Sequence, residues 1–419
     1  MEKNKKHINL IILSIIPVLL IIAGFIIDKP GDIIKGLYDI VVYPDILLID
    51  YLVVGDIGAT FVNSGLVTLM SLWIVYRCNM EIDGLLIAAI LTVAGFSFIG
   101  KNIINTWPIF IGTVMYAKCK GMEFRDISVQ SLFATTLAPA VSLIAFGLGI
   151  NYIISIPVAI ITGMAIGFIV VPLANHMVKF HDGYSLYNMG FVGGIIGTLI
   201  TSLLKGFGYD VESQFYISTG HNDLLRNLLI LIFIIFIMVG FHMNNRSFKG
   251  YRSVLRQSGR GATDFVDHFG YGLAYINIGI LGLISVLYVI LVKGIFNGPV
   301  VAGILTVAAF ASCGKHPKNC IPILIGAYLA AMLMVFEVTN TSILMAALFG
   351  TTLAPIAGCY GVVAGIIAGF LHVSIVSNVG IIHGGLNLYN NGFSGGIVAA
   401  IMVPILQVIF NMKDRECLG

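Results

Sequence analysis

Apolar residues fill long unbroken stretches of this chain and do not alternate with polar ones. Such runs recur from end to end, for example at 8–27, 153–174 and 224–243. As helices, runs of about twenty residues are long enough to cross roughly 30 Å of hydrocarbon. The weak ten-residue alternation of a membrane β-barrel is missing. The pattern therefore predicts an all-α, polytopic membrane protein.

Composition supports this prediction. The chain of 419 residues is 58% hydrophobic and 10% charged, with a mean hydropathy of +0.99, whereas soluble proteins carry about 25% charged residues. A soluble domain is therefore not expected. The first apolar run follows MEKNKKH and could pass for a signal peptide. No small-residue cleavage site follows it, so we expect the first membrane helix there.

One phrase occurs twice. Residues 181–195 read HDGYSLYNMGFVGGI and residues 383–397 read HGGLNLYNNGFSGGI, with identical residues at ten of fifteen positions. A second pair, LTVAGFSFIGKNIINTWPIFIG (91–112) and LTVAAFASCGKHPKNCIPILIG (305–326), keeps the frame GK-x3-N-x2-PI-x-IG. A third is SLFATTLAP (131–139) with ALFGTTLAP (347–355). The offsets are 202, 214 and 216, which places a short insertion near 141–156. These repeats predict an internal duplication, with repeats at 1–208 and 209–419.

The charges predict that the two repeats are inverted. Each half contains about seven apolar segments, and an odd number makes the second copy enter from the opposite side. With the N-terminus in the cytoplasm, seventeen basic residues lie on the cytoplasmic side and six on the outer side, as the positive-inside rule requires. Residues 28–56 carry six aspartates and two lysines, whereas the equivalent residues 244–261 carry five basic residues and no acid.

The GK frames predict two re-entrant hairpins with tips at residues 100–105 and 314–319. Pro108 and Pro322 are expected in the first turn of the second half-helix, which would present free amides to an anion. The candidate ligands for a small polar or anionic solute are the conserved side chains of the two frames: Lys101, Asn105, Lys315 and Asn319. Alternatively, the lysines extend to the lipid headgroups from ordinary short loops.

Two further phrases add candidates. The TTLAP phrases place Thr135, Thr136, Thr351 and Thr352 ahead of a proline, where they could line broken helices or simply bond back to carbonyls at a kink. Polar pairs also stand at the start of an apolar helix in each copy: Tyr187, Asn188, Tyr389 and Asn390. They could line a vestibule or cap the helix.

An intramembrane serine hydrolase is the alternative function. GFSGG at 392–396 contains G-x-S-G, yet the first copy has Val192 in place of Ser394. An HExxH motif is missing, and the six cysteines form no CxxC pair. The sequence therefore predicts no catalytic residue, metal or cofactor, and leaves Ser394 as the candidate nucleophile if the protein is an enzyme.

The paired frames FxxxGKxxxNxxPIxIG, LFxTTLAP and HxGxxLYNxGFxGGI resemble an uncharacterised bacterial membrane-protein family, domain of unknown function 1576, which occurs twice per chain. The resemblance implies a bacterial inner-membrane protein and brings no activity with it. The plan of two inverted halves with re-entrant hairpins is also similar to urea transporters, in architecture only.

Together these patterns predict a membrane transporter or channel for a small polar or anionic solute, with both termini in the cytoplasm. The partners would be the solute and membrane lipid. The basic run at 246–260 is read as a topology signal that touches anionic lipid, and nucleic acid is not expected as a partner. The substrate, the coupling ion, the choice between carrier and pore, and the oligomeric state, a homo-oligomer included, stay open.

Overall fold

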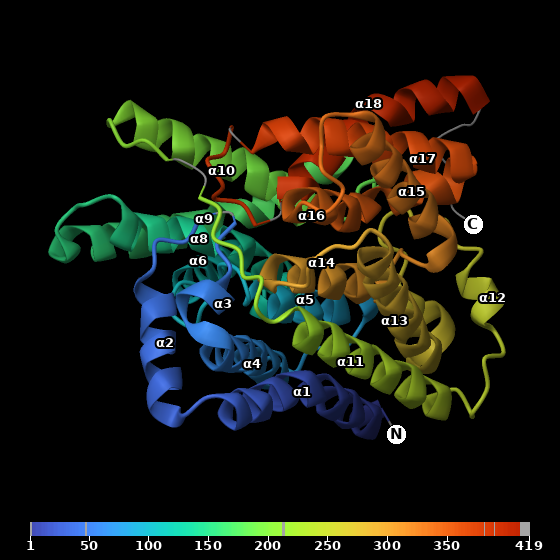
Figure 1. The fold of residues 1–419 in the computed structure, drawn as a ribbon, viewed down its shortest axis with the longest axis horizontal. Helices are drawn as coiled ribbons and strands as arrows, with labels where there is room; N and C mark the ends of the chain where they lie inside the picture. The colour runs from blue at the N-terminus through green and yellow to red at the C-terminus, as the bar shows by residue number, and fades with distance from the viewer. Residues whose placement is uncertain (1, 47, 212–213, 381, 389, 411–419) are drawn as a thin grey trace.

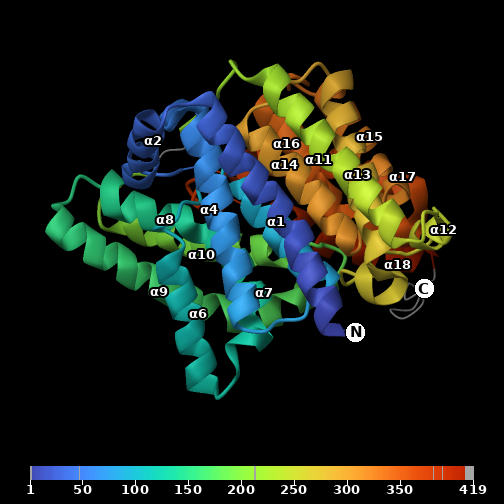
Figure 2. The same cartoon turned by 90° about the horizontal axis from the view of Figure 1, so that it is seen from below.

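The computed structural model describes residues 2–46, 48–211, 214–380, 382–388 and 390–410. Regular structure in these ranges is helical throughout (Figures 1 and 2). Among the described residues, nine helices are long and apolar enough to cross a membrane, and three shorter apolar helices accompany them. The prediction of an all-α polytopic membrane protein is confirmed.

The helices form two series in the same order. The first comprises α1 (Glu2–Ile27), α2 (Pro30–Val42), α3 (Tyr51–Val54), α4 (Asp56–Arg77), α5 (Gly84–Phe96), α6 (Trp107–Lys120), α7 (Ser128–Ala134), α8 (Ala138–Ser142), α9 (Tyr152–Met177) and α10 (Asn188–Gly206). The second comprises α11 (Asn222–Met243), α12 (Tyr251–Val254), α13 (Phe265–Leu291), α14 (Gly298–Ala309), α15 (Pro317–Leu333), α16 (Thr341–Gly350), α17 (Ala354–Val379) and α18 (Asn390–Phe410). Packing repeats as well: α1 lies on α4 as α11 lies on α13, and α6 lies on α9 as α15 lies on α17.

The expected insertion near 141–156 has a structural form. In the first series a π-helical turn, Leu143–Gly147, and residues 148–151 separate α8 from α9. In the second series α17 runs on through this region and is only kinked, at Gly361, whose φ of 90° suits glycine. The two series therefore differ in how the same bend is made.

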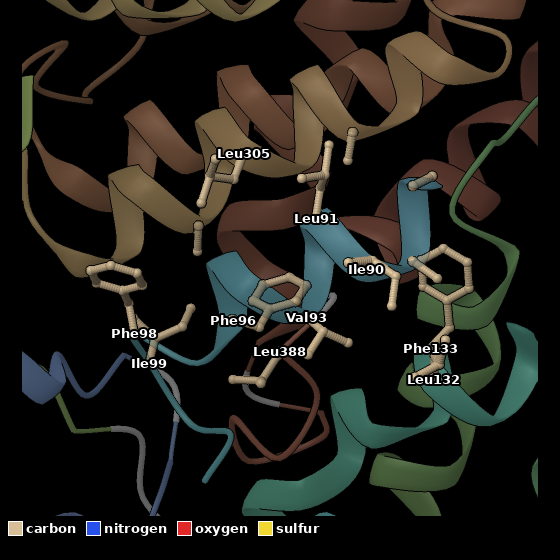
Figure 3. Close-up of a cluster of buried hydrophobic side chains, with 14 of the residues drawn as sticks. Ile90, Leu91, Val93, Phe96, Phe98, Ile99, Leu132, Phe133, Leu305 and Leu388 are labelled. Atoms are coloured by element: carbon tan, nitrogen blue, oxygen red, sulfur yellow. The ribbon is translucent and has the colours of Figure 1, made fainter. Parts of the chain in front are cut away.

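The short helices α5 and α14 lie antiparallel at the centre. The Ser312 hydroxyl, just after α14, donates to the Gly84 carbonyl at the start of α5, at 2.5 Å. At the other end, Gly298 at the start of α14 lies against the carbonyl of Phe98. Figure 3 shows the repeat-equivalent Leu91 and Leu305 in the apolar cluster around this pair. Both helices are apolar on every face because both are buried on every face.

The periphery carries the apolar surface expected to face lipid. Helices α1, α9 and α11 expose large apolar side chains, among them Ile11, Ile153 and Met238. Helices α1 and α11 lie side by side, and both views show them running in opposite directions (Figures 1 and 2). The polar and charged side chains described next lie inside this apolar shell.

Candidate functional site

An asparagine closes each GK loop. The Asn105 side chain accepts from the Asn102 amide at 2.9 Å and donates to the Gly100 carbonyl at 3.1 Å. Asn319 repeats both contacts, with the His316 amide at 2.9 Å and the Gly314 carbonyl at 2.9 Å. Both asparagines are buried. These two predicted ligands therefore hold the backbone of the two tips in the same way.

A second asparagine, on the preceding long helix, ties each tip to the protein. Asn63 donates to the carbonyls of Ser97 and Lys101, both at 2.8 Å. Asn277 donates to the carbonyls of Ala311 and Lys315, both at 2.7 Å. The two asparagines lie at the 214 offset of the repeats. What points to their structural role in the sequence is an asparagine inside an apolar run in both copies, where an unpartnered polar group would be costly.

The second half-helix differs from its prediction in the second copy. Pro108 does lie in the first turn of α6. Helix α15, however, begins at Pro317, so Pro322 lies inside it and the expectation for Pro322 was wrong. The reason is local: His316 and Asn319 form a capping box that starts the helix one turn earlier.

Both lysines are fully buried, so neither extends to the headgroups. The Lys315 ammonium donates to the Tyr187 hydroxyl and, at 2.7 Å, to the Thr351 hydroxyl. The equivalent Lys101 ammonium finds no hydrogen-bond partner among the described residues. Each lies near the face of a phenylalanine of its own copy, Phe96 at 5.4 Å and Phe310 at 5.5 Å. The three ion pairs of the described ranges all lie at Arg125 or Arg226, so neither lysine has an acidic partner there.

Next to each lysine, a phenylalanine of one repeat packs against a phenylalanine of the other repeat. Phe96 stacks on Phe349 of the second copy, with centroids 5.6 Å apart. Phe310 packs on Phe133 of the first copy at 5.7 Å. Phe133 and Phe349 occupy equivalent positions in the TTLAP segments, just before the threonines. The surroundings of the two lysines are thus built alike, and the difference lies in the hydrogen bonds.

The TTLAP phrases form a short 3-10 turn in both copies, Thr135–Leu137 and Thr351–Leu353. Thr135 and Thr351 each donate back to a helix carbonyl at 2.6 Å, which fits the kink alternative. Thr351 also accepts from Lys315, which fits the predicted polar site. Both interpretations hold for Thr351, because a hydroxyl can donate and accept at once.

The second threonine of each TTLAP phrase binds the first repeated phrase, residues 181–195 or 383–397, of the other copy; we call this the opening phrase. The Leu186 amide donates to the Thr352 carbonyl at 3.0 Å, and the Leu388 amide donates to the Thr136 carbonyl at 3.2 Å. The Thr352 hydroxyl also accepts from the Tyr187 amide at 2.9 Å. The structure therefore joins the separate phrases of the sequence into two cross-repeat contacts.

The polar pairs are only partly described. Asn188 bonds His181 at 3.1 Å and the Ala174 carbonyl at 3.0 Å, and Asn390 bonds His383 at 2.7 Å. Tyr389, a predicted site residue, lies outside the described residues. Tyr187 and Asn188 of the first copy line a cavity.

Two cavities occupy equivalent places in the two repeats. The larger, about 320 Å³, is lined by Tyr187, Asn188 and Phe310 among others, and the smaller measures about 150 Å³. Eight lining positions of the smaller cavity are repeat equivalents of positions in the larger: Leu48, Met345, Val376, Ser377, Gly380, Gly385, Asn390 and Asn391. Tyr187 and Phe310 also contact the Lys315 ammonium. Lys315 therefore lies one side chain behind the wall of the larger cavity.

Two aspartates that sequence reasoning missed link the repeats. Asp264 caps α13 and also accepts from the Gly84 amide at the start of α5, at 2.9 Å. Asp50, its equivalent, caps α3 and accepts from the Gly298 amide at the start of α14, at 3.1 Å. The signal was available, since both lie at the 214 offset, but the linkers around them share little else. Each repeat thus caps the central helix of the other.

Ser394 has polar neighbours. Its hydroxyl lies 3.4 Å from His372 Nδ1, and His372 Nε2 lies 3.1 Å from the Asn391 side-chain oxygen. All three side chains are buried. The first repeat has Val192, Val170 and Met189 at the equivalent positions. The second repeat therefore carries a polar trio that the fold does without in the first.

The comparisons with known proteins give a family and no function. Residues 29–206 and 243–408 each match the sequence model of a family described as a protein of unknown function, DUF1576. No curated protein and no solved structure matches the chain, so the likeness to urea transporters gains no support. The matched ranges cover most of both repeats, as the duplicated motifs predict. The chain belongs to the DUF1576 family of unknown function and carries two copies of its domain in tandem.

Proposed function

We propose that this protein is an integral membrane transporter for a small anionic or polar solute. The observation that carries the proposal is the pair of equivalent lysines, buried without an acidic partner in the described interior of a membrane-type fold. Ionisable side chains inside membrane proteins are costly, and they commonly mark a solute path. A solute with negative charge would supply the counter-charge that the protein does not.

The larger cavity favours the same class of solute. Its wall combines polar side chains, including Gln130, Asn175 and Asn188, with the aromatic rings of Phe133 and Phe310. Among the described residues, no carboxylate lines this cavity. Polar groups at a few points of an otherwise apolar wall suit a small organic solute, and the nearby Lys315 favours an anion over a cation.

The architecture favours transport through inverted repeats. Helices α5 and α14 are antiparallel, and each is capped by the other repeat. The larger cavity is bordered by Gly261 and Ala262, which the charge pattern assigns to the cytoplasm, and the smaller by Phe215, assigned to the outside. In this proposal the GK loops are re-entrant tips, and the unequal cavities are the two ends of one solute path in the inner membrane.

Thermal unfolding of the purified protein tests the proposal, because a ligand that binds only the folded state raises its apparent stability. Benzoate, succinate and phosphate would be compared with urea and glycerol. We expect at least one anion to raise the unfolding temperature. Lys315→Gln should raise the anion concentration needed for this stabilisation at least tenfold. Lys318→Gln is the matched control, since Lys318 is exposed in the same tip. Equal stabilisation of both variants would contradict the proposal.

A second candidate function is favoured by the Ser394–His372 contact, which resembles a nucleophile and base. If the protein were a hydrolase, a fluorophosphonate probe would label it, and Ser394→Ala would abolish the labelling. If it is a transporter, Ser394→Val should fold and retain anion binding, because the first repeat already carries Val192 there. Labelling at Ser394 would replace the transporter proposal.

A further inference from the structure

Asp45 is a buried carboxylate that the site described above does not use. It lies in the segment between the first two candidate spans and is fully buried. One of its oxygens accepts from the Tyr51 hydroxyl at 2.8 Å and from the Asn105 side chain at 3.2 Å. Its other oxygen has no hydrogen-bond partner among the described residues. Asp45 therefore touches the residue that closes the first tip.

The second repeat shows that the fold does not need this carboxylate. The positions equivalent to Asp45, Tyr51 and Ser142 hold Gly259, Phe265 and Gly358. In their place the second repeat has close backbone packing, with Gly259 against the Gly314 carbonyl and Gly358 against the Ser258 carbonyl. Asn319 still closes its tip there. The first repeat thus adds a buried acid and its donors to a tip that folds without them in the second.

The groups around Asp45 leave its charge uncompensated. From α3 it faces the Tyr51 hydroxyl, from the tip the Asn105 amide, and from α8 the Ser142 hydroxyl, which also accepts from Asn105 at 3.0 Å. Tyr43 is the nearby titratable group of its own segment. Lys101, the basic residue of the same tip, makes no ion pair with it. A buried carboxylate with one unpartnered oxygen and no cationic partner favours its neutral form.

We propose that Asp45 is a proton-binding site that sets how firmly the first tip is held and so, given the transport function proposed above, couples protons to solute movement. The proton comes from bulk water and binds a carboxylate oxygen. The charged form binds the Asn105 and Tyr51 donors more strongly than the neutral form, because charge-assisted hydrogen bonds are the stronger ones. Deprotonation therefore clamps the tip, and protonation loosens it.

Burial raises the pKa of Asp45 to about 7, against the opposing hydrogen bonds from Tyr51 and Asn105. In the unfolded chain the carboxyl is ionised above about pH 5. The folded state therefore holds one proton more than the unfolded state below pH 7, and stability falls as the pH rises toward 7. Burial also raises the pKa of Asp50, to about 6. Burial lowers the pKa of His181, His316 and His383, and this opposes the slope because the unfolded state then holds the extra protons. The contribution of Asp45 is therefore measured as the difference between the wild type and Asp45→Asn.

The test titrates the protein with protons alone. Between about pH 6 and 7.5, the unfolding temperature of the wild type should fall relative to that of Asp45→Asn. Asp32→Asn, at an exposed site of α2, should keep the wild-type slope. An infrared band of a protonated carboxyl should fade over the same range and be missing from Asp45→Asn. A wild-type slope in Asp45→Asn would overturn the proposal, and so would Na⁺ stabilising the wild type and not this variant at pH 8.

A second variant keeps the carboxylate in case Asp45→Asn fails to fold. Tyr51→Phe, which introduces the residue found in the second repeat, removes a donor to the charged form and should move the transition to higher pH. At pH 8, a cysteine placed directly after the first tip by Thr106→Cys should react with a maleimide faster in the Asp45→Asn background than in the protein that keeps Asp45. An unmoved transition together with equal maleimide rates would overturn the proposal.

The outcome is separable from that of the transport proposal. In a Lys315→Gln background, Asp45→Asn should change the pH response as it does in the wild type, because Lys315 belongs to the other tip. If no anion stabilises the protein but the response depends on Asp45, the proton site stands and the transport proposal fails. If anions bind and the response does not depend on Asp45, the reverse holds.

Discussion

At the scale of single residues, the repeats place the same side chain in two different chemical situations. Lys315 donates to two hydroxyl groups, and Lys101 has no such partner among the described residues. A buried polar group without a partner costs roughly 1–3 kcal/mol, and a satisfied one costs far less. The two lysines should therefore contribute to the stability of the fold with opposite signs.

Replacement of each lysine by methionine, which is similar in length and uncharged, exposes this difference. Lys101→Met should raise the free energy of unfolding by about 1–3 kcal/mol, because an unpartnered buried amine is removed. Lys315→Met should lower it by a similar amount, because it removes the hydrogen bonds from the ammonium to Thr351 and Tyr187. Chemical unfolding in detergent measures both. A loss of stability in both variants would show that Lys101 has a partner in the folded protein.

At the scale of elements, the structure is held together by reciprocal contacts between repeats. Each central helix is capped by an aspartate of the other copy, and each TTLAP turn accepts an amide from the other copy's opening phrase. Helices α10 and α18 repeat the principle: Phe393 fills the space over Gly194, and Phe191 fills the space over Gly396. Neither repeat completes its own packing, so we expect the two to fold as one unit.

The aspartate caps offer a direct measurement. Asp264 accepts from the amides of Val266 and Asp267 on its own helix and from Gly84 of the other repeat. Asp264→Ala should therefore lower the free energy of unfolding by about 2–3 kcal/mol, more than the ~1 kcal/mol of a simple cap. The control is Asp267→Ala, at an exposed side chain of the same turn, which should cost within about 0.5 kcal/mol. Similar losses in the two variants would show that the contact between repeats contributes nothing.

At the scale of the whole molecule, the antiparallel central helices and the opposite directions of α1 and α11 fit an inverted duplication (Figures 1 and 2). Inversion in a membrane would put the equivalent linkers on opposite sides, and their charges differ as that arrangement requires.

Cysteine accessibility in cells tests this topology. In a background without the native cysteines, Ser253→Cys should be protected from a membrane-impermeant thiol reagent, and Thr219→Cys should react with it. Both side chains are exposed, so burial would not explain a difference. Reporter fusions should place both termini in the cytoplasm. Reaction of both cysteines, or of neither, would contradict the inverted arrangement.

The sequence by itself determined the class of protein, the duplication and the family. Apolar run length reports the thickness of the hydrocarbon that a helix must cross, and it needs no tertiary information. The GK frames indicated the loops at which the central helices end, because Gly, Asn and Pro act locally on the backbone. Pro322 was misplaced because the capping box of His316 and Asn319 starts α15 at Pro317, five residues before Pro322.

Tertiary structure alone decided which of these phrases meet. The TTLAP turn of one copy lies against the opening phrase of the other, and Asp50 and Asp264 reach across to the opposite central helix. No spacing along the chain encodes such contacts, because they join residues more than 160 positions apart whose proximity depends on how the two repeats pack. The same holds for Lys101 and Lys315, which are identical in their motifs. Only the packing of Tyr187 and Thr351 around Lys315 separates a hydrogen-bonded amine from an unpartnered one.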